Sequence, residues 1–174
     1  MKIHTALLVI DVQEGMFVPD YPVFQGQVLL DKIEGLISKA RASQVPVIYV
    51  QHNEEPGEQL VPHSEDWQIQ SQIAPEEGET IVQKFKPDGF LETDLQEKLE
   101  SLGIRKLVVT GIQTDMCVNA TCKRANQLGY EVVIVEDAHT TYDQGDRSAS
   151  EIIQEYNDKF RSFAEVRSAE TILF

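Results

Sequence analysis

The chain has 174 residues, of which 41% are hydrophobic, which suffices for one sizeable core but is too short for two ordinary domains. We therefore expect a single domain over residues 1–174. Acidic residues outnumber basic ones by 29 to 15, and the formal net charge of −14 argues against nucleic acid and anionic membranes as partners. No apolar run approaches the roughly 20 residues that span a bilayer, and no complete signal sequence precedes Asp11, so we predict a cytoplasmic protein.

Short apolar runs alternate with segments of helical periodicity along the chain. The predicted strands cover residues 7–10, 47–50, 80–82, 106–110 and 131–135, with a sixth at 164–166. The predicted helices cover residues 28–42, 91–102, 114–128 and 148–163. Such alternation is typical of a parallel sheet with right-handed crossovers and helices on both faces. The sequence therefore predicts a three-layer α/β sandwich around a mainly parallel, six-stranded, Rossmann-like sheet.

The stretch 107–118, LVVTGIQTDMCV, is predicted to be a strand, a tight turn and the start of a helix. Gly111 ends the apolar run where the backbone needs freedom, and Thr114 is the expected N-cap. Cys117 then lies at the third helical position, where backbone N–H groups favour the thiolate. Cys122 lies about 140° further around the same predicted helix, so the two cysteines cannot form a disulfide there.

Asp11, Lys84 and Cys117 each lie just past the end of a predicted strand, and the carboxyl ends of parallel strands share one edge of a sheet. They form a chemically complete set for nucleophilic catalysis. Asp11 is a base for the thiol, Lys84 is a fixed positive charge, and the backbone at the helix start offers donors for an oxyanion. Each residue alone also has a simpler explanation, as a loop cap, a surface charge or a small core residue. Their combination favours a nucleophilic cysteine.

Further residues are candidates for the wall of a substrate pocket, although a pocket wall and a core look alike in sequence. They are Phe17, His52, Trp67, Phe85 and His139. His139 follows a strand end and either lines the site or packs and caps a turn. His52 and His63, with the acidic residues nearby, do not have the spacing of a compact metal motif, so we expect no metal and no cofactor.

Four stretches of the chain together match the motif pattern of a known family. They are ALLVIDVQEGMF with Asp11, VQKFKPDGF with Lys84, LVVTGIQTDMCV with Cys117, and GYEVVIVEDAHTTYD after it. In order and spacing, from about Thr5 to near the C-terminus, they resemble the isochorismatase-like cysteine hydrolases. This family includes nicotinamidases, N-carbamoylsarcosine amidohydrolases and isochorismatases.

The resemblance implies a three-layer α/β fold with six parallel strands and a catalytic triad of Asp11, Lys84 and Cys117. It also implies a cis peptide between Ile112 and Gln113, with the N–H groups of Gln113 and Cys117 as the oxyanion hole. A small-molecule substrate and a homo-oligomer, a dimer or larger, are further implications of the resemblance.

Differences between this sequence and the family's motifs narrow the range of expected activities. Nicotinamidases hold a metal through an Asp-x-His pair, but here Val50 stands two residues before His52. Isochorismatases proper cleave a vinyl ether mainly by acid catalysis, and their nucleophile position need not be cysteine, so Cys117 favours acyl transfer. We therefore predict cysteine-dependent hydrolysis of a small amide or related C–N bond through a thioester. Two alternatives stay open: vinyl ether cleavage with Asp11 as the acid, and a catalytically silent small-molecule binding module.

Overall fold

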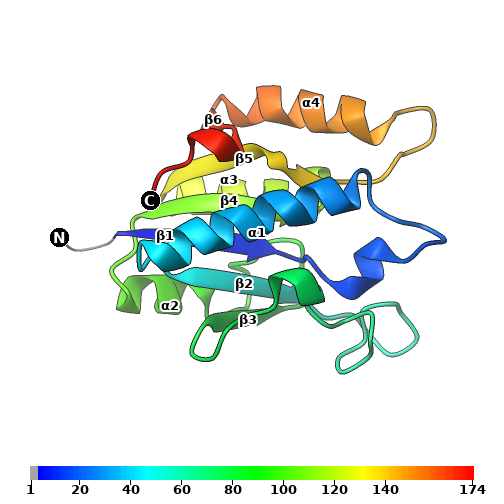
Figure 1. Ribbon diagram of the computed structural model, residues 1–174, viewed down its shortest axis with the longest axis horizontal. Coiled ribbons are helices and arrows are strands. Elements are labelled where there is room, and N and C mark those ends of the chain that lie inside the picture. Colours follow the sequence, from blue (N-terminus) through cyan, green and yellow to red (C-terminus); the bar gives the residue numbers. More distant parts are fainter. Residues whose placement is uncertain (1–3) are drawn as a thin grey trace.

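The computed structural model describes residues 4–174. Within them, one sheet has the strand order β3-β2-β1-β4-β5-β6, and every neighbouring pair is parallel (Figure 1). The strands are β1 (Thr5–Ile10), β2 (Val47–His52), β3 (Thr80–Lys84), β4 (Lys106–Ile112), β5 (Glu131–Thr140) and β6 (Glu165–Arg167). The strand order reverses direction between β1 and β4, and open α/β sheets place their sites beyond the carboxyl ends at such a point. The predicted six-stranded parallel sheet is confirmed.

Helices cover both faces of the sheet (Figure 1). Helix α1 (Gly26–Ala42) packs on the face to which Leu7 and Val9 point. Helices α2 (Leu95–Ser101), α3 (Asn119–Gln127) and α4 (Ala149–Phe160) contribute to the core on the other face, to which Leu8 and Ile10 point. Successive residues of a strand point to opposite faces, so the continuous apolar run of β1 fills both cores. The predicted three-layer sandwich is confirmed.

Two element boundaries differ from the prediction for identifiable reasons. The helix predicted from residue 91 begins only at Leu95, because Glu92 has a left-handed backbone with φ of 56°. Strand β5 continues to Thr140 instead of ending at residue 135, since a register shift opposite β4, between Val109 and Gly111, lets the pairing resume.

The predicted continuous helix 114–128 is interrupted near its start. A five-residue π-helical turn, η3 (Thr114–Val118), precedes α3, and Gln113 occupies the N-cap position. The predicted N-cap role of Thr114 is wrong, because its buried hydroxyl lies 2.7 Å from Nδ1 of His139. His139 Nε2 in turn contacts the carbonyl oxygen of the Asn157 side chain at 2.8 Å. An amide oxygen only accepts, so Nε2 carries the proton and Nδ1 accepts from Thr114.

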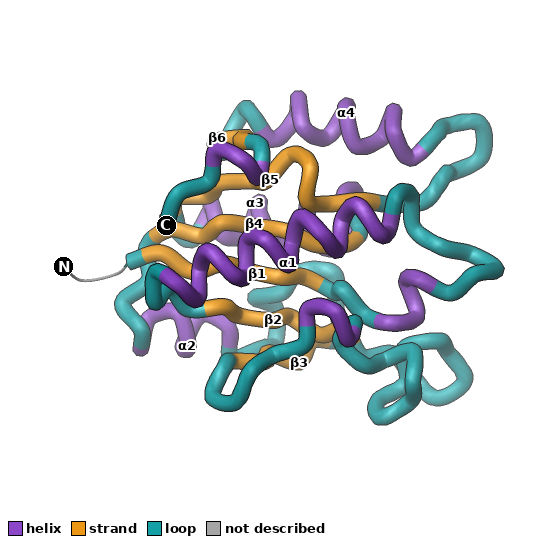
Figure 2. Tube along the Cα trace, in the orientation of Figure 1, coloured by secondary structure: helices purple, strands orange, loops and turns teal. Residues whose placement is uncertain are grey.

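The long connections lie beyond the carboxyl ends of the strands (Figure 2). The segment after β1 contains a 3₁₀ turn, η1 (Glu14–Phe17), and the segment between β2 and β3 contains another, η2 (Ser71–Ile73). An isolated antiparallel bridge between Gln13 and Ile69 joins these two segments. Over the part of the chain that the structure describes, none of the helices combines the length and apolar composition that a membrane crossing needs.

Candidate active site

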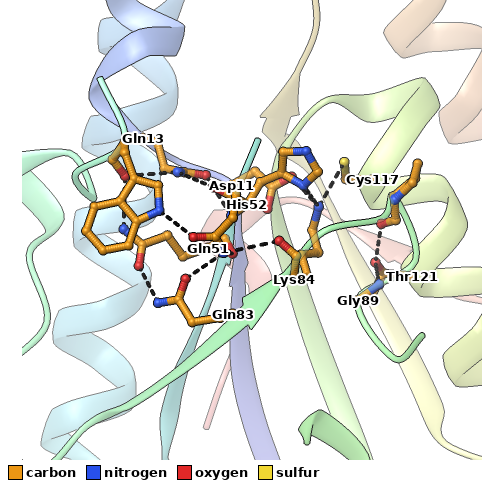
Figure 3. Close-up of polar contacts among 12 residues, drawn as sticks. Asp11, Gln13, Gln51, His52, Gln83, Lys84, Gly89, Cys117 and Thr121 are labelled. Carbon is orange, nitrogen blue, oxygen red and sulfur yellow. Dashed lines mark hydrogen bonds and ion pairs between the residues drawn. The ribbon is translucent and has the colours of Figure 1, made fainter. Parts of the chain in front are cut away.

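The ammonium group of Lys84 is the centre of the candidate site. Its Nζ lies 2.9 Å from Oδ2 of Asp11, 3.3 Å from Sγ of Cys117 and 2.8 Å from Nδ1 of His52 (Figure 3). The side chains of Lys84 and Asp11 are 0% and 2% exposed. The structure thus brings together the three residues that the sequence placed at strand ends, and it places His52, a predicted pocket residue, in contact with one of them.

Strand register places these groups. Lys84 is the last residue of β3, rather than the residue past its end, and pairs with His52 at the end of β2. Asp11 follows β1 directly, in a left-handed backbone conformation with φ of 52°, and its N–H donates to the carbonyl of Val50. A non-glycine residue in this conformation is uncommon and is often found at functional sites.

Gly111 lets β4 approach β1 immediately before the site. Its φ is 134°, and a Cβ built on it would lie only 2.1 Å from the carbonyl oxygen of Ile10. Only glycine fits such an approach. The next peptide bond, between Ile112 and Gln113, is cis. The backbone of this turn leads directly into η3, which carries Cys117.

The charges of the site oppose a free thiolate. Burial alone would lower the pKa of Lys84, but Asp11 and Cys117 outweigh it, so this pKa is raised and the ammonium stays charged. Burial and the Asp11 carboxylate raise the pKa of the Cys117 thiol, and Lys84 offsets only part of this rise. The predicted bias of Cys117 toward thiolate is therefore wrong, because desolvation and a nearby negative charge outweigh the helix start.

Asp11 has a free acceptor inside the site. Its Oδ1 is the one buried side-chain oxygen or nitrogen without a hydrogen-bond partner among residues 4–174. A buried carboxylate oxygen normally has a partner, so an orphaned one marks a place where a proton or a ligand can bind. The absence of a partner at this oxygen suits Asp11 to receive a proton from a group bound in the site.

Trp67 belongs to a network of side-chain amides next to the site, which includes Gln13, Gln51 and Gln83 (Figure 3). Its indole Nε1 donates to Oδ1 of Asn53 at 2.9 Å, and its carbonyl accepts from the amides of Gln13 and Gln51 at 2.9 Å each. Gln83 donates to Oε1 of Gln51 at 2.7 Å. This network was not predicted from the sequence, although a glutamine follows each of the first three predicted strands within three residues. The network fixes the 53–70 connection against β2 and β3.

The other predicted pocket residues lie in different surroundings. Phe85 is 60% exposed, one residue after Lys84. Phe17 packs against the core on the α1 face and lines a surface groove with Glu14 and Asp66. His139 is buried in its contacts with Thr114 and Asn157, and burial lowers its pKa to about 4, so it is neutral and supports the start of η3.

The segment after Lys84 is fixed to α3. The N–H of Gly89 donates to Oγ1 of Thr121 at 3.0 Å (Figure 3), and Asp88 forms an ion pair with Arg124 at 2.9 Å. These contacts hold the Pro87-Asp88-Gly89 sequence beside the helix that follows Cys117. Among residues 4–174, no group of three or more His, Cys, Asp or Glu side chains is arranged to hold a metal ion.

A buried carboxylate and ammonium, in contact with a partly buried thiol at the carboxyl edge of a parallel sheet, define the candidate active site of an α/β protein. The profile of the Isochorismatase domain matches residues 5–171. The chain belongs to the isochorismatase family.

Known proteins support this membership. A streptothricin hydrolase of Streptomyces noursei is 37% identical over 138 residues, which cover 79% of this chain and 50% of that protein. The ureidoacrylate amidohydrolase RutB of Enterobacter sp. (strain 638) is 27% identical over 171 residues, covering 78% of this chain and 74% of that protein. The crystal structure of an isochorismatase from Pseudomonas putida KT2440 superposes with a TM-score of 0.93 at 29% identity, covering 98% and 90% of the two chains. The chain spans about half the length of the streptothricin hydrolases that it matches.

Proposed function

We propose that the protein is an amidohydrolase that cleaves a small amide or related C–N bond through a thioester at Cys117. The observation that carries this proposal is the contact of one buried ammonium, Lys84 Nζ, with both a carboxylate and a thiol. A base, a nucleophile and a fixed charge in contact are the parts that thiol acyl transfer needs. The amidohydrolase among the relatives supports a C–N bond as the target.

The proton of Cys117 moves as the new bond forms. Its raised pKa keeps the proton on sulfur until a substrate carbonyl is in place. Asp11 then takes the proton while the sulfur attacks the carbonyl carbon. In this proposal the backbone N–H groups of Gln113 and Cys117 stabilise the oxyanion. Asp11 next protonates the leaving nitrogen, the C–N bond breaks, and a thioester remains on Cys117.

Water completes the cycle. Asp11 is again a carboxylate after the amine leaves, and it takes a proton from the water that attacks the thioester. The tetrahedral intermediate collapses, the acid leaves, and the proton returns from Asp11 to the sulfur. Lys84 stays protonated throughout, because its raised pKa reflects the negative groups around it. The ion pair with Asp11 thus limits the net charge that is buried at each step.

Two variants test the function on a panel of small primary amides and N-carbamoyl amines, with ammonia release as the readout. Cys117→Ala and Asp11→Asn should each lower kcat/KM about a thousandfold or more, because each removes a group that acts in bond making. Cys122→Ala is the matched control and should keep turnover, since Cys122 lies on the buried face of α3, in the core.

Other outcomes would support the two alternative functions. Turnover of a vinyl ether substrate that survives Cys117→Ala but not Asp11→Asn would replace the amide mechanism with acid catalysis. Binding of small molecules in a thermal-shift screen without any turnover would indicate a silent binding module. The proposal also includes a cytoplasmic location and, as the family resemblance implies, a homo-oligomer, whose size analytical ultracentrifugation would measure.

A further inference from the structure

We propose that His52 is a substrate-binding residue, which donates a hydrogen bond from Nε2 to a second acceptor oxygen of the substrate. This inference rests on the proposed function and narrows its substrate class. It would assign a role to His52, whose side chain contacts the Lys84 ammonium without taking part in the bond-making steps.

The protons of Lys84 determine the tautomer of His52. An ammonium group has three N–H bonds and no lone pair, so it can only donate. Its three neighbours are Oδ2 of Asp11, Sγ of Cys117 and Nδ1 of His52, at 2.9, 3.3 and 2.8 Å. Nδ1 must therefore be an unprotonated acceptor, and the single ring proton is on Nε2.

The charged surroundings keep the ring neutral. Burial and the Lys84 ammonium lower the pKa of His52, against smaller opposing effects of Asp11 and Glu54. A neutral ring whose Nδ1 accepts is a fixed donor at Nε2 near neutral pH. Such a donor recognises an oxygen acceptor and gains little from a substrate amine.

The backbone of His52 is held on both sides. The amide of Gln13 donates to the His52 carbonyl at 3.0 Å and accepts from its N–H at 3.0 Å. The register of β2 with β3 pairs His52 with Lys84. A donor that is fixed before substrate arrives costs less entropy on binding.

The Nε2 atom is open to a ligand. It has no hydrogen-bond partner among residues 4–174. If Nε2 were also buried, it would be a second buried side-chain polar atom without a partner, but Oδ1 of Asp11 is the one such atom among these residues. Nε2 therefore lies at accessible surface. Since His52 and Cys117 contact the same nitrogen, this donor lies close to the sulfur that would attack the substrate (Figure 3).

The position of the donor defines a substrate class. The scissile carbonyl oxygen is assigned to the oxyanion donors, so His52 would bind another oxygen a few bonds away. The inferred substrates are small amides with a second carbonyl group near the scissile one. Simple alkyl amides lack this acceptor and should bind more weakly.

Malonamide and butyramide make a matched pair of probes, because they have similar length and only malonamide has a second carbonyl. Their binding can be measured as protection of Cys117 from alkylation by iodoacetamide, which needs no turnover. We expect malonamide to protect the wild-type protein at about a tenfold lower concentration than butyramide, the effect of about one hydrogen bond.

Two variants separate the ends of the imidazole. His52→Asn keeps an acceptor at the Nδ1 position for Lys84 but has no group at the Nε2 position, and it should lose the preference for malonamide. His52→Gln places an amide N–H near the Nε2 position and should retain the preference. Unchanged alkylation of each variant without amide would show that Lys84 and Cys117 are still in place.

The inference is overturned if malonamide and butyramide protect the wild-type protein equally, or if His52→Asn keeps the preference. A ¹⁵N spectrum of the wild-type histidines at neutral pH gives a second test that needs no variant. It should show His52 protonated at Nε2 only, and a proton on Nδ1 would refute the assignment. Because neither measurement depends on turnover, failure of the thioester mechanism would be seen separately, as retained activity of Cys117→Ala.

Discussion

Replacing Asp11 with asparagine should make Cys117 more acidic, although it should abolish catalysis. The raised pKa of the Cys117 thiol has two causes, burial and the Asp11 carboxylate. Asp11→Asn replaces the negative carboxylate with a neutral amide. The burial of Cys117 and the Lys84 ammonium stay in place. The thiolate should therefore form at lower pH in the variant than in the wild-type protein.

The structure gives the size of this effect. Oδ2 of Asp11 and Sγ of Cys117 both contact Nζ of Lys84, at 2.9 and 3.3 Å, so they are at most about 6 Å apart. Two like charges at about 6 Å repel by about 3 kcal/mol at an effective dielectric constant of about 20. This repulsion corresponds to about 2 pH units. The midpoint of Cys117 ionisation should fall by about this amount.

The assay is the rate of alkylation by iodoacetamide as a function of pH, followed by peptide mass spectrometry. Alkylation accelerates as the pH rises through the pKa of the thiol. The rate for the wild-type protein should therefore increase only at a pH above about 8.5, the ordinary pKa of cysteine, and the rate for the variant should increase at a lower pH than in the wild-type protein. Cys122 is an internal control in the same molecule, because it is buried and should react slowly in both proteins. Fast reaction of wild-type Cys117 well below pH 8, or identical curves for the two proteins, would refute this account of the site charges.

Three further substitutions test the fold around the site. Lys84→Met should destabilise the protein by about 3–5 kcal/mol in denaturant unfolding, because it leaves a buried carboxylate unpaired; adding Asp11→Asn should recover most of the loss, and a double variant as unstable as the single one would contradict this cause. Gly111→Ala should lower the free energy of unfolding by more than about 4 kcal/mol, because the added Cβ would lie 2.1 Å from the Ile10 carbonyl oxygen. Gly129→Ala is the control, with φ of 89° but no atom within 4 Å of the added Cβ, and should lower it by about 1–2 kcal/mol. Equal losses of stability in the two variants would count against the steric explanation. Ser148→Ala removes a capping box with Glu151 at the start of α4 and should lower stability by about 1 kcal/mol in thermal unfolding, and an unchanged midpoint would show that the cap contributes nothing.

The sheet and the position of the three central residues could be predicted from the sequence because they depend on local patterns. Short apolar runs next to amphipathic segments indicate a parallel sheet, and the carboxyl ends of parallel strands share one edge. Asp11, Lys84 and Cys117 were therefore expected at the same edge of the sheet. Their distances depend on strand register, which the sequence does not specify in an apolar run buried on both faces.

The failed predictions for Thr114 and Cys117 share a cause, since each depended on side chains that are distant in sequence. Thr114 does not cap a helix because His139, 25 residues later, accepts its hydroxyl proton. Cys117 does not favour the thiolate because Asp11 and burial oppose it, and neither effect is visible within the LVVTGIQTDMCV stretch. The contact of His52 with Lys84 likewise follows from β2–β3 pairing. Local propensity predicts the elements, and the chemistry of the site comes from contacts between them.

Partitioning of the acyl-enzyme between water and hydroxylamine is a direct probe of the proposed thioester at Cys117. If an amide and the methyl ester of the same acid form one acyl-enzyme, then hydroxylamine at a fixed concentration must give the same ratio of hydroxamate to acid from both. The thioester mechanism predicts equal ratios for a substrate from the amide panel and the methyl ester of the same acid. Ratios that differ between the two substrates would show that they share no acyl-enzyme and would contradict the covalent mechanism.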